Sequence, residues 1–412
     1  MVTIPKGWRK CLVSDVVEVS RGASPRPIEN YITSNVNGVN WIKIGDAPRS
    51  GNRIRHTAER ITPEGASRSV TVHAGDLILS NSMSFGRPYV VGIDGCIHDG
   101  WLKLSEFTLS ADTEFLVYLL SSRAVTSQYE SLAAGSGVKN LNKEVVSEVA
   151  LELPQLAEQR AIAQVLSGFD EHLANLDELI AKKKAIRDGA IENLISGTER
   201  LSGFNGEWVD MVFGQAIIPK ARIGWQNLRT DEYLDTGYSY IIGGTDFSDG
   251  TVDLASCKFV SKERFLMDPA IQVNQGDILV TKDGTIGKVA VVPSLERPAT
   301  LNSGVYVFRS VGLVTTRFLY WVLRSTVFDD FIAGLSAGST IKHLYQKDLG
   351  NFHFRAPKDT FEQDSIAEVM SSLETDLHVL KEERAKVQRL KLGAMDDLLT
   401  GHVRLPIEER AA

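Results

Sequence analysis

The sequence repeats itself after about 200 residues. The stretch GDLILSNSMSFGRPYVV at residues 75–91 returns as GDILVTKDGTIGKVAVV at residues 276–292, with its middle changed. Three further pairs keep the same order along the chain: FLVYLLSS (115–122) with FLYWVLRS (318–325), EQRAIAQVL (158–166) with EQDSIAEVM (362–370), and SGTERL (196–201) with TGHVRL (400–405). This period is too long for a solenoid unit and predicts a duplicated domain pair.

Each copy of the repeat has two parts of different composition. In the first part, short β-branched runs lie between Gly, Ser, Asn and Pro, which predicts strands and hairpins. One helix is expected there, at residues 113–132 and again at 316–335. The second part is one long helix. We therefore predict an α+β fold with a pseudo-twofold internal repeat, divided into globular domains at 1–154 and 201–357 and long helices at 155–200 and 358–412.

The long helices carry a heptad pattern, because their apolar positions alternate spacings of four and three. The positions are Ile162, Leu166, Phe169, Leu173, Leu176 and Ile180 in the first copy, and Ile366, Met370, Leu373, Leu377, Leu380 and Val387 in the second. Arg384 interrupts the second seam, and Gly197 and Gly401 indicate the helix ends. The shared register predicts that the two helices pair as an antiparallel coiled coil. The alternative is that each helix packs on its own domain.

The sequence contains no pattern of catalytic or metal-binding residues. There is no HExxH, no P-loop, no G-x-S-x-G elbow and no Cys/His pair at metal-ligand spacing. Cys11, Cys96 and Cys257 are far apart, so buried reduced thiols are expected. His98 and Asp99 are adjacent, but Asn302 and Ser303 stand at their place in the second copy. We therefore expect a chain that is not an enzyme by itself, and catalysis would come from a partner.

Bulk composition narrows the class of protein. No apolar run approaches the ~18–20 residues that would cross a membrane, and the start of the chain has no signal-peptide core, so a cytoplasmic protein is expected. The net charge of −7 gives no support to a nucleic-acid role. It does not exclude that role, because binding to phosphates needs a local basic face and not a basic total.

Two motifs, each present twice, resemble those of the specificity subunit of type I restriction-modification systems. They are LPQLAEQRAIAQVL (153–166) with APKDTFEQDSIAEVM (356–370), and AGSGVKNL (134–141) with AGSTIKHL (337–344). The resemblance covers nearly the whole chain. It implies that each globular domain is a target recognition domain reading one half of a split, asymmetric DNA site, and that the paired helices form the spacer.

The resemblance also implies partners. Two methyltransferase (modification) subunits would dock on the helices, bind S-adenosylmethionine and methylate adenine. Motor-endonuclease (restriction) subunits would use ATP and magnesium to cleave unmethylated DNA, a defence against phage. This chain would need no cofactor or metal of its own and would bind double-stranded DNA.

If the resemblance holds, the changed middle of the repeat would contain the side chains that contact base edges, and basic residues in matching positions would contact phosphates. Arg87 and Lys288 share one such position. A loop at 43–55 is rich in arginine, whereas its counterpart at 242–250 is acidic. The candidates are Lys43, Arg49, Arg53, Arg55, Asn81, Ser82, Arg87, Lys139, Asn140, Lys282, Asp283, Thr285, Lys288, Lys342 and His343.

Three alternatives stay open at this point. The candidate side chains are also what ordinary polar turns and surfaces contain. The chain also fits the specificity subunit of a methyltransferase-only system. Alternatively, it is a coiled-coil scaffold with two protein-binding heads and no DNA role.

Overall fold

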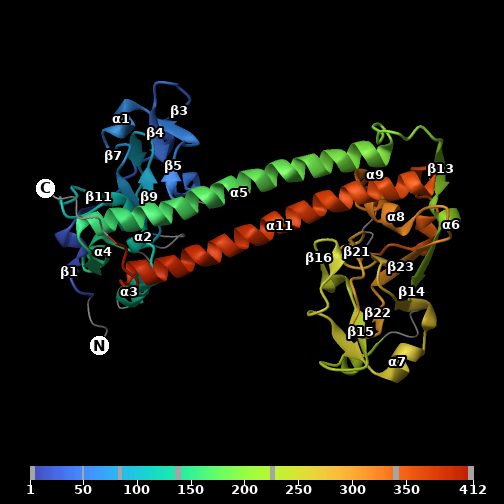
Figure 1. Cartoon of the computed structure of the whole chain (residues 1–412). Coiled ribbons are helices and arrows are strands. Elements are labelled where there is room, and N and C mark those ends of the chain that lie inside the picture. Colours follow the sequence, from blue (N-terminus) through green and yellow to red (C-terminus); the bar gives the residue numbers. More distant parts are fainter. Residues whose placement is uncertain are drawn as a thin grey trace. The chain divides into compact units, whose positions relative to one another are not determined.

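The computed structural model describes residues 5–48, 51–81, 86–134, 141–222, 228–336 and 343–406. The chain forms two compact units, one made of residues 1–179 with 381–412 and the other of residues 180–380. Each unit holds one globular domain and a segment of both long helices (Figure 1).

The domain of the first unit contains two five-stranded sheets and a two-stranded one. The strands of the first five-stranded sheet are, in order across it, β3 (Ile32–Thr33), β6 (Glu59–Ile61), β4 (Val39–Ile42), β10 (Gly95–Ile97) and β7 (Val70–Val72). Those of the second are β2 (Glu18–Arg21), β11 (Trp101–Ser105), β8 (Leu77–Ser80), β9 (Pro88–Val91) and β5 (Arg53–Ile54). The two-stranded sheet pairs β1 (Arg9–Leu12) with β12 (Ala150–Leu153). The short helices are α1 (Pro63–Ala66) and α4 (Lys143–Ser147).

The second domain follows the same plan. The strands of its six-stranded sheet are, in order across it, β14 (Ile217–Ala221), β23 (Val305–Ser310), β20 (Ile278–Thr281), β21 (Val289–Val291), β17 (Thr251–Val252) and β16 (Phe247–Ser248). Those of the four-stranded sheet are β18 (Lys258–Val260), β15 (Ser239–Ile242), β22 (Ala299–Leu301) and β19 (Gln272–Val273). The two-stranded sheet pairs β13 (Trp208–Val212) with β24 (His353–Pro357). The short helices are α6 (Phe213–Ala216), α7 (Lys262–Leu266) and α10 (Gln346–Leu349).

Corresponding strands pair in the same sense in both domains. β8 and β9 are antiparallel, as are β20 and β21. β4 and β10 are parallel, as are β15 and β22. The expectation of one mixed α+β scaffold used twice is confirmed.

The prediction of a single helix at residues 113–132 and 316–335 is wrong in both copies, because two helices stand at each place. α2 (Thr113–Leu120) is followed by α3 (Arg123–Ala134), and α8 (Thr316–Val322) by α9 (Thr326–Ser336). The breaks fall at Ser122 and Ser325, which are buried. The Ser122 hydroxyl accepts the N–H of Val125 at 3.4 Å, and the Ser325 hydroxyl donates to the Val322 carbonyl at 2.7 Å. Serine side chains compete with helical backbone bonds in this way, and apolar periodicity does not reveal it.

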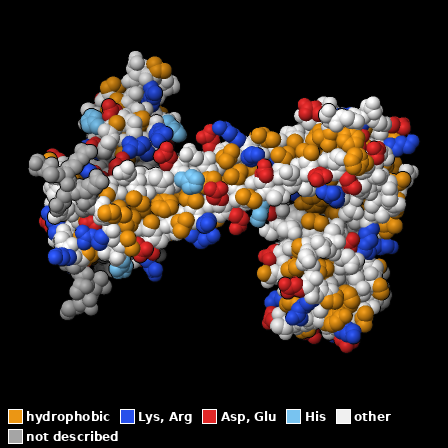
Figure 2. Space-filling model, in the orientation of Figure 1, with side chains coloured by type: hydrophobic (Ala, Val, Ile, Leu, Met, Phe, Trp, Pro, Cys, Tyr) orange, Lys and Arg blue, Asp and Glu red, His pale blue; other side chains and the backbone are white. Residues whose placement is uncertain are grey.

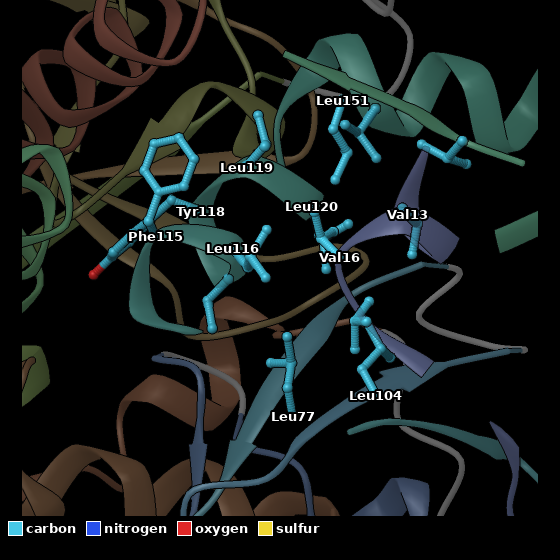
Figure 3. Close-up of a cluster of buried hydrophobic side chains, with 14 of the residues drawn as sticks. Val13, Val16, Leu77, Leu104, Phe115, Leu116, Tyr118, Leu119, Leu120 and Leu151 are labelled. Atoms are coloured by element: carbon cyan, nitrogen blue, oxygen red, sulfur yellow. The ribbon is translucent and has the colours of Figure 1, made fainter. Parts of the chain in front are cut away.

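The helix α2 lies at the centre of the first core. All its side chains from Phe115 to Leu120 are buried. Figure 3 shows Phe115, Leu116, Tyr118, Leu119 and Leu120 together with Leu77 and Leu104 from the sheet and Leu151 from β12. The same core includes Leu166 and Leu398 of the long helices. Since burial of each large apolar side chain contributes about 2 kcal/mol, this packing joins the sheet firmly to the helices.

The long helices are α5 (Leu156–Ser196) and α11 (Thr360–Leu399), and each is followed by a glycine at positive φ, Gly197 at 73° and Gly401 at 69°. All the seam residues are buried or half-buried. No helix in the described part of the chain is long and apolar enough to cross a membrane.

Ion pairs join the two long helices in each unit, and their order along the helices shows that the helices run antiparallel. In the first unit, Asp177 pairs with Arg384, the residue that interrupts the seam; the distance from Arg384 Nη2 to Asp177 Oδ2 is 3.0 Å. In the second unit, Lys183 pairs with Asp376 at 3.0 Å. The predicted helix pairing is therefore confirmed, and the alternative in which each helix packs only on its own domain is wrong.

Candidate nucleic-acid interface

The candidate site of each domain lies at one β-hairpin, β8–β9 in the first domain and β20–β21 in the second. The aspartate that opens the hairpin is held in the same way in both. The carboxylate of Asp76 accepts the N–H of His73 at 2.9 Å, and that of Asp277 accepts the N–H of Asn274 at 3.0 Å. These aspartates are thus part of the scaffold, as their place in the repeat indicated.

The far end of the hairpin is closed by a hydroxyl in both copies. The N–H of Arg87 donates to Ser80 Oγ at 3.1 Å, and the N–H of Lys288 donates to Thr281 Oγ at 2.9 Å. A basic residue therefore directly precedes the returning strand at the same position in each domain.

Glycine is required just before that basic residue. Gly86 has φ of 74° and Gly287 of 82°, a conformation that other residues adopt only with strain. A Cβ on Gly86 would also come within 2.6 Å of the Tyr129 ring. The turn can therefore change its middle residues while its closing geometry stays fixed.

Two other segments meet this turn in each domain. The N–H of Asn81 donates to Gly100 O at 3.0 Å, and that of Lys282 donates to Gly304 O at 2.8 Å. The Asn81 carbonyl then accepts the N–H of Leu141 at 3.0 Å. In the second domain the Lys282 carbonyl accepts the N–H of Leu344 at 2.8 Å. We call these meeting points, together with the cations beside them, the loop corner. Its described residues are 26, 81, 87, 98–100 and 141 in the first domain and 282–285, 288, 302–304 and 343–344 in the second.

The loop corner of the second domain presents charged groups. Lys282 lies over the ring of Tyr306, with its Nζ 5.5 Å from the ring centroid. Asp283 is exposed and bonded to the imidazole of His343. Thr285 and Lys288 are exposed, and Lys288 has no ion pair among the described residues. Five predicted residues are thereby brought to one edge of the sheet.

In the first domain, Asn81 does not fit the role predicted for it. It is 5% exposed, and its amide donates to the Asp99 carbonyl at 2.8 Å. The structure therefore argues against direct base reading by Asn81. Arg87 is half-buried; its guanidinium donates to Gly51 O at 2.9 Å and lies 5.1 Å from the centroid of the Tyr89 ring.

The neighbouring His98 and Asp99 belong to a polar cluster. The sequence showed that these two residues are adjacent but did not indicate a role for them. The Asp99 carboxylate accepts the Ser24 hydroxyl at 2.9 Å and pairs with Arg26 at 3.1 Å. Burial alone would raise the pKa of Asp99, but these bonds keep it below its usual value. Burial lowers the pKa of His98. Arg26 is an exposed cation at the loop corner that sequence reasoning missed, because only the fold brings residue 26 to residue 99.

A cavity of about 870 Å³ opens beside this cluster. Arg26, Lys43 and Glu59 are among its lining residues, and Lys43 pairs with Glu59 at 2.5 Å. Arg53 and Arg55, from the arginine-rich loop, are both exposed, and Arg53 pairs with Glu114 at 2.6 Å. Two of the predicted phosphate contacts are therefore already engaged by carboxylates.

The remaining predicted residues, Arg49, Ser82, Lys139, Asn140 and Lys342, lie outside the described residues. Within the described part, no three His, Cys, Asp or Glu side chains gather as a metal site would require. Figure 2 shows basic and acidic side chains interspersed on the visible face.

Comparison with known proteins decides the family. A model described as the type I restriction modification DNA specificity domain matches the chain twice, over residues 5–184 and 226–389. The chain belongs to this family. The two matches coincide with the two copies of the repeat, so the resemblance inferred from the motifs is confirmed.

Similar specificity subunits are found in distant organisms. The type I restriction enzyme MjaVIII specificity subunit of Methanocaldococcus jannaschii is 20% identical, and the alignment covers 98% of this chain and 94% of that protein. The EcoBI specificity subunit of Escherichia coli is 23% identical over 85% of this chain and 76% of its own length.

Two solved structures share the fold. The S subunit of a type I restriction-modification system from M. genitalium superposes with a TM-score of 0.62 at 18% identity, covering 97% of both chains. A chain from a structure on complex assembly and conformational transition of the type I R-M system gives 0.59 at 18% identity, covering 97% of this chain and 100% of that one.

Proposed function

We propose that this chain is the DNA-recognition subunit of a type I restriction-modification complex and that each globular domain reads one half of a split, asymmetric site. One observation carries this proposal. The backbone bonds of the loop corner are the same in both domains, whereas the side chains on it differ. This is the arrangement expected if one scaffold presents different reading edges to different bases.

Contacts at the loop corners divide by chemistry. Basic groups such as Arg87, Lys288 and Arg26 suit phosphates, which fix position without reading sequence. Lys282 and Asp283 suit base edges, because lysine can donate to guanine and a carboxylate can accept from cytosine. The turn residues differ between the two copies, Ser82-Met83-Ser84 against Asp283-Gly284-Thr285, which supports unlike halves.

The long helices would set the distance between the half-sites and hold two methyltransferase subunits. Apolar side chains remain exposed on them at Leu179, Ile186, Val379 and Leu390, which supports a protein partner along the pair. The chemistry would then belong to those partners. S-adenosylmethionine would bind there, and ATP and magnesium would bind to the restriction subunits where these are present.

The acidic net charge favours one competing function, a scaffold whose two heads bind proteins. The two functions differ in their response to salt. For a DNA-binding protein, log affinity for DNA falls with log salt concentration, and each neutralised phosphate makes this slope steeper by about 0.9. A scaffold that binds only proteins makes no phosphate contacts and contributes nothing to this slope.

Titration of a generic DNA duplex with the assembled methyltransferase complex tests this directly. Arg87→Met and Lys288→Met should each reduce the slope by about 0.9, since each removes one phosphate contact. Lys358→Met is the matched control, because Lys358 is an exposed cation paired with Glu207 at 3.6 Å and follows β24, which is not in the sheet that carries the loop corner. Slopes that do not change in Arg87→Met and Lys288→Met would contradict the assigned phosphate contacts.

A further inference from the structure

Each long helix carries a carboxylate near the end of its apolar core with the domain. Asp170 lies one turn after the buried Leu166 in α5. Glu374 lies one turn after the buried Met370 in α11, directly after Leu373, which packs against the second core. The two positions are 204 residues apart (374 − 170), as are the two copies of the helix motif. Both side chains are partly buried, with 29% and 24% exposed.

Both carboxylates bind a cation on the other long helix. Asp170 Oδ1 lies 2.5 Å from Lys391 Nζ, and Glu374 Oε2 lies 2.7 Å from Arg187 Nη1. Lys391 and Arg187 are themselves 204 residues apart (391 − 187). The repeat has therefore kept an acid and a base at the same two places in each unit.

Each carboxylate also binds its own recognition domain. The Tyr118 hydroxyl of α2 donates to Asp170 Oδ2 at 2.8 Å. In the second unit, Arg324 Nη2, just after α8, lies 3.3 Å from Glu374 Oε1. Tyrosine in one domain and arginine in the other thus make the same connection from different positions. We call each set, Tyr118–Asp170–Lys391 and Arg324–Glu374–Arg187, a polar link.

The second polar link continues into the sheet. Arg324 Nη1 donates to the Tyr320 hydroxyl at 2.5 Å, and that hydroxyl donates to the Gly250 carbonyl at 3.1 Å. Gly250 lies in the turn between β16 and β17, strands of the same sheet as the β20–β21 hairpin. A shift of the helix would therefore be transmitted to the sheet that carries the loop corner.

Cavities flank the first polar link. A cavity of about 440 Å³ has Arg87, Tyr118, Asp170 and Lys391 in its lining, and one of about 470 Å³ includes Arg53, Tyr118 and Asp170. In the second unit a cavity of about 470 Å³ reaches Tyr320 and Trp321. Apolar packing is not directional, whereas charge-assisted hydrogen bonds are.

We propose that Asp170 and Glu374 are positioning residues that fix the rotation of each recognition domain about the helix pair, and with it the number of base pairs between the half-sites. This rests on the proposed function. One base pair changes the distance between half-sites by about 3.4 Å and their relative rotation by roughly 35°. A domain must therefore be held to within a few ångströms to reject a site whose gap is one base pair too long or too short.

Two groups of the polar links, Tyr118 and Arg187, have raised pKa values. Burial and the bond to Asp170 raise the pKa of Tyr118, so its hydroxyl remains a donor. Burial alone would lower the pKa of Arg187, but its bonds to Glu374 and Asp188 raise it.

A library of the two half-sites with gaps from two base pairs shorter to two longer than the natural gap tests the proposal in the assembled methyltransferase complex. The wild type should methylate one gap. Tyr118→Phe and Arg324→Met remove only the domain's part of each link. They should raise methylation at the neighbouring gaps about tenfold, because one bond to a charged group is lost, while both half-sites remain necessary.

Lys183→Met is the matched control. Like Arg324→Met, it removes a cation from a carboxylate of α11 in the same unit, but its pair with Asp376 joins the two helices alone. It should keep the single gap. Broadening of the same size in this control would overturn the proposal, because general loosening of the helices would then explain the effect.

A single gap in both Tyr118→Phe and Arg324→Met would also overturn it. Should Arg324→Met fail to assemble, Glu374→Asp keeps the charge and shortens its reach, and a single gap in that variant has the same meaning. A wild-type complex that methylates no split site would instead contradict the proposed function itself.

Discussion

At the scale of single residues, the motif that carried the family resemblance joins the helix ends to the domains. Glu158 and Glu362 start the long helices and are 1% exposed. Glu158 binds Arg404, which follows the end of α11, and Glu362 binds Arg200, which follows the end of α5; both pairs include an N–O distance of 2.7 Å. The neighbouring Gln363 donates to the Pro357 carbonyl at 2.7 Å.

Removal of one partner of such a pair should be costly. Arg200→Met would leave the buried Glu362 carboxylate without its cation, and we expect a loss of about 3 kcal/mol in the free energy of unfolding. Lys358→Met breaks the exposed pair with Glu207 and should cost less than about 1 kcal/mol. Urea unfolding of the two variants measures both. Equal losses would show that burial does not strengthen the Arg200 pair.

The thiol of Cys257 should be inert in the folded protein. Burial, followed by the nearby Asp246, raises its pKa to about 12. At pH 8, well below that pKa, about one thiol in ten thousand is then the reactive thiolate. Iodoacetamide labelling followed by mass spectrometry should find Cys257 unmodified at pH 8 and modified in denaturant. Rapid labelling of the folded protein would contradict this.

At the scale of elements, the sequence was informative wherever a pattern is local. Heptad spacing predicted the helix pair, and short β-branched runs between turn residues predicted the strands and hairpins. The break at Ser122 was missed because apolar periodicity continues through it. The buried state of Asn81 was missed because a carbonyl 18 residues later accepts its amide. The polar links were missed for the same reason, since Tyr118 and Asp170 meet only in the fold.

The turn of the first hairpin should be exchangeable. Replacing Ser82-Met83-Ser84 with Asp-Gly-Thr from the second copy, while keeping the buried Asn81, should change the bases read in one half of the site only. The reason is that Ser80 and Gly86 close this turn just as Thr281 and Gly287 close the other. Sequencing of methylated DNA made by the variant complex reads the result. A change in both halves would contradict independent reading.

At the scale of the whole molecule, the duplication matters more than the composition. A chain with net charge −7 is a poor candidate for DNA binding by bulk attraction. Two copies of one scaffold nevertheless place basic and polar side chains at equivalent loop corners, and helices continuous with both domains join them. We infer that specificity arises from two local contacts held at a set distance.

A methylation map tests this account most directly. The chain would be expressed with the methyltransferase subunits from its own genome, in a host without other adenine methylation, and the modified bases would be sequenced. The account predicts a split motif with two unlike halves and one fixed gap. A continuous motif, or an unmethylated genome despite an assembled and active complex, would contradict it.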